Sequence, residues 1–92
     1  MNQPYYVRQS PFEFPCSYSL KVMGRNTNEF HAVVRSIIER HVNGNEEVRY
    51  HTRTSSERKY MSVTATFSAE SKAQLDAIYL DLNRHDLVLM TL

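Results

Sequence analysis

The order of hydrophobic patterns along the chain constrains its fold more than any other feature. Apolar residues recur with helical spacing in two segments and alternate with polar residues in four others. In chain order these segments predict strand, helix, strand, strand, helix, strand. Two helices on one face of a four-stranded sheet bury every apolar stripe and face together. Right-handed crossovers then place the first and third strands in the middle, which predicts an α+β, ferredoxin-like βαββαβ sandwich with an antiparallel sheet.

The two helices have clear apolar stripes and expected caps. Asn26 and Glu29 resemble a capping box at the start of the first helix. Gly44 is expected to end that helix in a left-handed cap, and Ser68 or Ser71 to begin the second. The stripe of the first helix consists of Phe30, Val33, Val34, Ile37, Ile38 and His41. The stripe of the second consists of Leu75, Ile78, Tyr79 and Leu82.

The four strands are expected at residues 17–23, 46–54, 59–67 and 87–92. The second of them alternates charged with less polar residues, which is typical of an edge strand. Residues 55–58 are expected to form the turn of a hairpin between the second and third strands.

Length and composition limit the chain to one domain with few long-range attractions. A chain of 92 residues has room for one core, expected over residues 16–92 behind a partly flexible tail at 1–15. The net charge of +1 attracts neither nucleic acid nor an anionic membrane. No apolar run approaches the ~20 residues that span a bilayer. Cys16 is the only cysteine and cannot form an internal disulfide, which favours the cytoplasm.

Three segments together resemble the YbeD family of small bacterial proteins. The opening Phe14-Pro15-Cys16 with residues 20–24, the hairpin at 55–63 and the ending at 75–92 follow the pattern of that family. The resemblance implies a ferredoxin-like fold close to that of ACT domains, which bind small effectors and regulate enzymes. It also implies an uncharacterised function. The family's gene often lies beside that of the octanoyl transferase of lipoate assembly, which implies a connection to lipoate metabolism.

One departure from the family pattern lies in the hairpin turn. The family usually carries a glycine after the serine pair, whereas this chain has Glu57 and Arg58. The resemblance therefore does not extend to the hairpin tip as a shared binding site.

Catalytic, metal and cofactor sites are not expected, so the sequence predicts a protein that is not an enzyme. The four histidines come from four different elements and lack the spacing of a metal site on a helix. Cys16 is interpreted as a half-buried small residue rather than a reactive thiol, because no local general base accompanies it. A metallochaperone needs a second cysteine, and residues 23–26 have too few glycines for a phosphate loop.

Nucleic-acid binding is also not expected. An RNA-recognition domain of this fold needs outward aromatic rings on its central strands. The outward positions here are serine, threonine and lysine, with Tyr60 as the one stacking ring.

Two loops or edges are candidates for binding. Gly24, Arg25 and Asn26 form a candidate effector loop of the ACT type, although Gly24 has the alternative role of supplying a backbone shape forbidden to other residues. A basic cluster suits an acidic partner or, alternatively, a solvated edge that resists aggregation. It consists of Arg49, Arg53, Arg58 and Lys59.

The last strand is apolar on both sides. If Val88, Met90 and Leu92 face the helices, Leu87 and Leu89 face outward and form a candidate partner surface or homodimer contact. The alternative is that N-terminal aromatic residues cover it, namely Tyr5, Tyr6, Phe12 and Phe14.

These patterns together predict a non-catalytic regulatory or adaptor domain that acts through protein contacts. The alternative is an ACT-like sensor of a small effector. The sequence names neither the partner nor the ligand.

Overall fold

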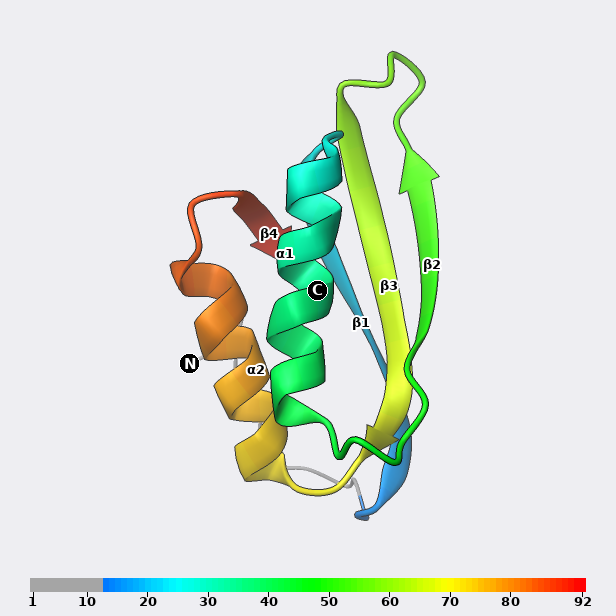
Figure 1. The fold of residues 1–92 in the computed structure, drawn as a ribbon, viewed down its shortest axis with the longest axis vertical. Helices are drawn as coiled ribbons and strands as arrows, with labels where there is room; N and C mark the ends of the chain where they lie inside the picture. The colour runs from blue at the N-terminus through cyan, green and yellow to red at the C-terminus, as the bar shows by residue number, and fades with distance from the viewer. Residues whose placement is uncertain (1–12) are drawn as a thin grey trace.

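The computed structural model describes residues 13–92 and contains the six predicted elements in the predicted order. The sheet order is β2-β3-β1-β4, every neighbouring pair is antiparallel, and both helices cover the same face (Figure 1). This is the ferredoxin-like sandwich that the sequence predicts. The tail expected at 1–15 lies mostly outside the described residues. The elements are β1 (Cys16–Arg25), α1 (Asn28–His41), β2 (Arg49–Thr54), β3 (Tyr60–Ala69), α2 (Lys72–Arg84) and β4 (Val88–Thr91).

The core lies between the helices and the inner faces of β1 and β3. Strand alternation turns every second side chain of these two strands toward the helices, and the predicted stripes of α1 and α2 pack onto them. Tyr79 adds a polar contact at the edge of this core. Its hydroxyl donates to the carbonyl of Leu92 (3.2 Å) and lies 2.9 Å from the hydroxyl of Tyr18. Burial, reinforced by the bond with Tyr18, raises the pKa of Tyr79 above its ordinary value.

The observed caps differ from the predicted ones at two of three positions. Thr27, not Asn26, caps α1, because its hydroxyl accepts the N–H of Phe30 (2.9 Å). Gly44 has no left-handed backbone, so that prediction was also wrong. The chain instead leaves α1 through an extended Val42, whose side chain is buried in the core. Ser71, one of the two predicted alternatives, caps α2, and Ser68 lies within β3.

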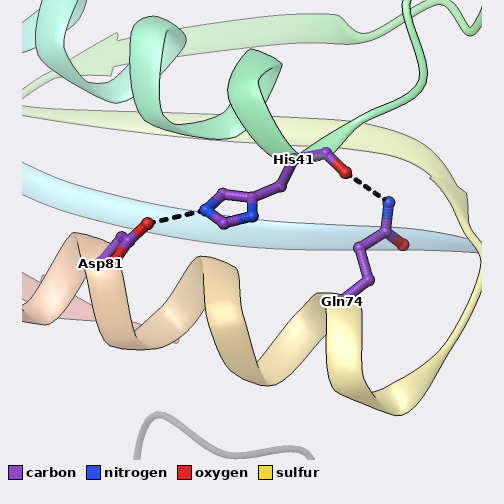
Figure 2. Close-up of polar contacts among 3 residues, drawn as sticks. All are labelled: His41, Gln74 and Asp81. Atoms are coloured by element: carbon purple, nitrogen blue, oxygen red, sulfur yellow. Dashed lines mark hydrogen bonds and ion pairs between the residues drawn. The ribbon is translucent and has the colours of Figure 1, made fainter.

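Two polar contacts join α1 to α2 (Figure 2). Nε2 of His41, near the end of α1, lies 2.7 Å from Oδ2 of Asp81 on α2. The side-chain amide of Gln74 donates to the backbone carbonyl of His41 (2.9 Å). The bond with His41 lowers the pKa of Asp81 below its ordinary 3.8. His41 therefore acts as a structural link between the helices.

The β2–β3 hairpin extends past the N-terminal end of α1 (Figure 1). Its turn is closed by backbone hydrogen bonds from Ser55 to Tyr60 and from Arg58 to Ser55, both 2.9 Å. Arg58 adopts the left-handed conformation with φ of 62°. Arg58 therefore bears the strain that a glycine at this position would avoid.

Candidate functional site

The helices leave one face of the sheet uncovered, called here the open face. All charged side chains of the sheet lie on this face, and all of them are basic. None of the 10 acidic residues lies in a strand. The strands do carry basic side chains, and each of these alternates along its strand with the positions that face the helices. The open face is therefore positively charged although the whole chain is nearly neutral. Its basic residues are Lys21, Arg25, Arg49, His51 and Arg53.

One row of side chains crosses this face from edge to edge. The register sets Arg53 of β2 beside Ser62 of β3, Ser62 beside Met23 of β1, and Met23 beside Met90 of β4. The row is cationic at the β2 edge and apolar at the β4 edge. The open face thus offers charge and apolar contact side by side.

A hollow of about 470 Å³ lies over this row. Its apolar part comes from methionine and leucine side chains, and its cations are Lys21 and Arg53. Hydroxyl groups of the hairpin complete its wall. The lining consists of Lys21, Met23, Arg53, Thr54, Ser55, Tyr60, Met61, Ser62, Leu89 and Met90.

A bulge in β4 exposes two consecutive apolar residues. Val88 pairs with Gly24 and Met90 pairs with Met23, which leaves Leu89 as an extra residue between them. Leu89 is 58% exposed and Met90 is 50% exposed. The expectation that Met90 faces the helices was therefore wrong.

The residue that β4 buries is polar. Thr91 is buried, and its hydroxyl accepts from the side-chain amide of Asn83 at 3.0 Å. This bond satisfies the hydroxyl and makes its burial tolerable. Leu92 follows on the exposed side, so the expectation that it faces the helices was also wrong.

The two residues predicted as a partner surface lie in different environments. Leu89 is exposed on the open face, beside Met90. Leu87 is half-buried and packs against the core, and its backbone N–H donates to Nδ1 of His85 (3.1 Å). The structure therefore places only Leu89 on an accessible apolar surface. The N-terminal residues proposed to cover it, Phe14 excepted, lie outside the described part of the chain, and Phe14 packs against the core.

Gly24, expected as the first residue of an effector loop, lies within β1 and is closely packed. A Cβ atom there would lie 2.4 Å from Cε1 of Phe30 and 2.7 Å from the carbonyl oxygen of Leu87. The backbone of Gly24 is not left-handed, so its role is to let the Phe30 ring approach the strand. This corrects the alternative that the sequence suggested, a backbone shape forbidden to other residues.

Arg25, which is the last residue of β1 rather than part of a loop, and Asn26, which follows it, are tied to the β2–β3 hairpin. Asn26 donates from its backbone to Lys59 and from its side-chain amide to Arg58, both at 3.0 Å. The guanidinium of Arg25 lies 5.8 Å from the centre of the Tyr60 ring, within cation–π range. These polar groups thus serve to anchor the hairpin.

The remaining residues considered for chemistry have separate surroundings. Cys16 is half-buried at the start of β1. His31 lies 6.4 Å from the Tyr50 ring, between ring centres, and His51 lies on the open face. Among residues 13–92, no three His, Cys, Asp or Glu side chains gather as a metal site would require. Within the same range, neither helix is long and apolar enough to cross a membrane.

Sequence reasoning missed most of the open face as a unit. It identified Leu89 and the arginines of β2 but did not join them to Met23, Met90 and Lys21. The grouping needs the strand register, which places residues from four strands in one row. The positive sign of the face could not be read from the predicted bounds, because the strand predicted at 46–54 includes Glu46 and Glu47, whereas β2 begins at Arg49.

Comparison with known proteins gives a consistent result. A family profile described as "Protein of unknown function (DUF493)" matches residues 9–92. A UPF0250 protein of Chromobacterium violaceum is 38% identical over 85 residues, covering 92% of this chain and 96% of the relative. Another, of Paraburkholderia phytofirmans, is 37% identical over 86 residues, covering 94% and 97%. The solution structure of protein HP0495 from H. pylori matches with a TM-score of 0.74 at 16% identity, covering 100% of this chain and 97% of that one. This last likeness concerns the fold alone.

Proposed function

The chain belongs to the DUF493 family of proteins of unknown function, in agreement with its resemblance to the YbeD family, and on this premise we propose that it is a non-catalytic regulatory or adaptor domain. It acts in the cytoplasm by binding another protein through the open face. Its link to lipoate metabolism, implied by the resemblance, would lie in the identity of that partner.

The observation that carries this proposal is the exposed apolar patch of β4 beside the cations of the open face. Leu89 and Met90 of β4 and the following Leu92 are each at least half exposed, although the sheet has a well-filled core on its other side. Contiguous exposed apolar side chains on a small protein commonly mark an interaction site. Methionine and arginine are also enriched at protein interfaces.

The test compares two leucines that receive the same substitution. Leu89→Glu places a charge on the open face, whereas Leu80→Glu places it on the exposed side of α2, where the wild-type leucine is 36% exposed. Tagged wild type and both variants are used to recover proteins from an extract of a related bacterium, with quantification by mass spectrometry. We expect a partner recovered by wild type and Leu80→Glu and lost with Leu89→Glu. Equal recovery by all three would contradict the proposed surface.

A small-effector sensor is the second candidate, favoured by the hollow over the open face. Its volume of about 470 Å³ falls in the range of ligand pockets, roughly 300–1,000 Å³. The test is thermal unfolding against amino acids, octanoate, lipoate and nucleotides. A ligand present at a hundredfold excess over its dissociation constant adds about 2.7 kcal/mol of stability. No shift with any of these compounds would reject this candidate for them.

A further inference from the structure

We propose that the partner supplies an extended acidic segment that pairs with the free edge of β2. Carboxylates at alternate positions of this segment would contact the basic row of β2, which consists of Arg49, His51 and Arg53. The inference rests on the proposed function, since it takes the ligand to be a protein and the open face to be its docking side.

The edge of β2 is available for pairing. β2 has β3 as its only neighbour among the described residues, and Figure 1 shows it as the outermost strand. Five of its six side chains are exposed. An edge strand presents unpaired backbone N–H and C=O groups on its outer side, and an added strand satisfies them. The edge therefore supplies the backbone part of a binding site.

The basic row supplies the specificity. Arg49, His51 and Arg53 are two residues apart, so their side chains leave the same face at intervals of about 6.7 Å. In an antiparallel partner strand, residues directly opposite project from that same face within about 5.5 Å, measured between Cβ atoms. Acidic residues at alternate positions of the partner thus meet the whole row at once.

A second copy of the chain does not fit this edge. The antiparallel pairing of β2 with its own copy that is centred on His51 and keeps the two open faces on one side sets Arg49 opposite Arg53. Like charges directly opposite destabilise a strand pair. The charges that discourage self-association thereby select an acidic strand.

The helix-facing side of β2 is unfavourable for the acidic side chains of the partner. The hydroxyl of Tyr50 donates to Oε2 of Glu39 on α1 (2.9 Å). The guanidinium of Arg35 lies over the Tyr50 ring at 4.8 Å and is 3.5 Å from the same carboxylate. An added carboxylate on this side would meet Glu39 and an arginine that is already paired. The site therefore requires the acidic side chains to project from the open face.

The experiment uses two fluorescent peptides of identical composition, six residues long like β2. In one, glutamate alternates with threonine; in the other, the three glutamates are consecutive. Binding is measured by fluorescence anisotropy with the full chain. We expect the alternating peptide to bind about tenfold more tightly, because it alone presents three carboxylates to one face. Equal affinity would overturn the proposal by reducing it to general charge attraction.

Backbone pairing is tested with two N-methylated forms of the alternating peptide. One carries methyl groups on the glutamate amides and the other on the threonine amides, so that each removes the N–H groups of one edge of the peptide. Strand addition predicts that one form loses binding while the other retains it, because only one edge faces β2. Retention by both forms would contradict strand addition.

Matched variants locate the site on the protein. Arg53→Glu should weaken the alternating peptide about tenfold, whereas Arg84→Glu, the same change at the end of α2, should leave it unchanged. An equal loss in both would overturn the proposed location. The outcome is separable from the general proposal: if Leu89→Glu abolishes partner recovery but the peptides do not discriminate, the docking face stands and the acidic strand does not.

Discussion

The side chains of β1 and β3 point alternately to the two faces of the sheet, and the two faces differ in how strongly packing constrains their residues. On the side of the helices, the side chains are fully buried and packed against α1 and α2, namely those of Leu20, Val22, Val63 and Ala65. On the open face, the residues between them are Lys21, Met23, Ser62 and Thr64, none of which is buried. Packing determines the first set closely and leaves the second set almost unconstrained.

This difference tells where to look for function in a small domain of this kind. A residue whose identity the core does not require is free to be selected for binding. The consistent positive charge and the exposed methionine and leucine of the open face are such choices. We therefore expect substitutions on the buried face of the sheet to affect stability and substitutions on the open face to affect contacts with a partner.

The largest expected effect comes from truncating one leucine on each side. Leu20→Ala should lower the free energy of unfolding by about 2–5 kcal/mol, because it leaves a cavity among buried side chains. Leu89→Ala should change it by less than about 0.5 kcal/mol, because the side chain is exposed. Urea denaturation of both variants measures the difference. Similar losses would show that the open face is packed against something in the intact protein.

The next effect comes from adding one methyl group on each side. Gly24→Ala places a Cβ against the Phe30 ring and the Leu87 carbonyl and should cost about 1–3 kcal/mol. Ser62→Thr adds a methyl group on the open face and should cost less than about 0.5 kcal/mol. Thermal unfolding compares them. A stable Gly24→Ala variant would mean that the ring can move and that space for a ligand exists there.

A smaller effect, of opposite sign, is expected where the sheet extends beyond the helices. Arg58→Gly should raise the free energy of unfolding by about 1 kcal/mol, because glycine adopts the left-handed backbone without strain. Arg58→Ala retains the strain and serves as the control. A loss of stability in the glycine variant would show that the arginine side chain itself holds the turn.

The smallest effect concerns the helix layer and depends on pH. The folded-state pKa of Asp81 is lowered, so its bond with His41 stabilises the fold above the ordinary carboxyl pKa and is lost as the pH falls through the lowered value. Asp81→Asn should therefore cost about 0.2–1 kcal/mol at neutral pH. The difference from wild type should shrink in acid. Denaturation midpoints between neutral and strongly acidic pH test this, and a pH-independent difference would contradict it.

The sequence predicted the features that depend on periodicity. The order of six elements and the buried stripes follow from local alternation, because burial imposes it directly. The features that it missed depend on competition or on distant contacts. Thr27 and Asn26 are both good caps one residue apart, and Gly44 lost its expected role because the chain buries Val42 instead. The bulge that exposes Met90 depends on pairing with β1.

The candidate site was predicted in pieces for the same reason. Leu89 was identified from an apolar run, and the arginines of β2 from their charge. That these belong to one surface depends on a register between strands far apart in the chain. The pattern that joins them, strands without a single acidic residue, depends on the observed start of β2 at Arg49, because the strand predicted at 46–54 includes Glu46 and Glu47.

The central place of β1 has a consequence for how the protein is made. As the chain leaves the ribosome, β1 emerges first, yet its partners emerge much later, since Cys16 pairs with Ala69 and Val22 with Thr91. Folding must therefore close long loops, which slows it. In the interval the strand is unpaired, with the apolar Leu20 and Val22 alternating with Ser19 and Lys21. Polar and charged residues within an apolar strand limit aggregation, so the open face also protects the nascent chain.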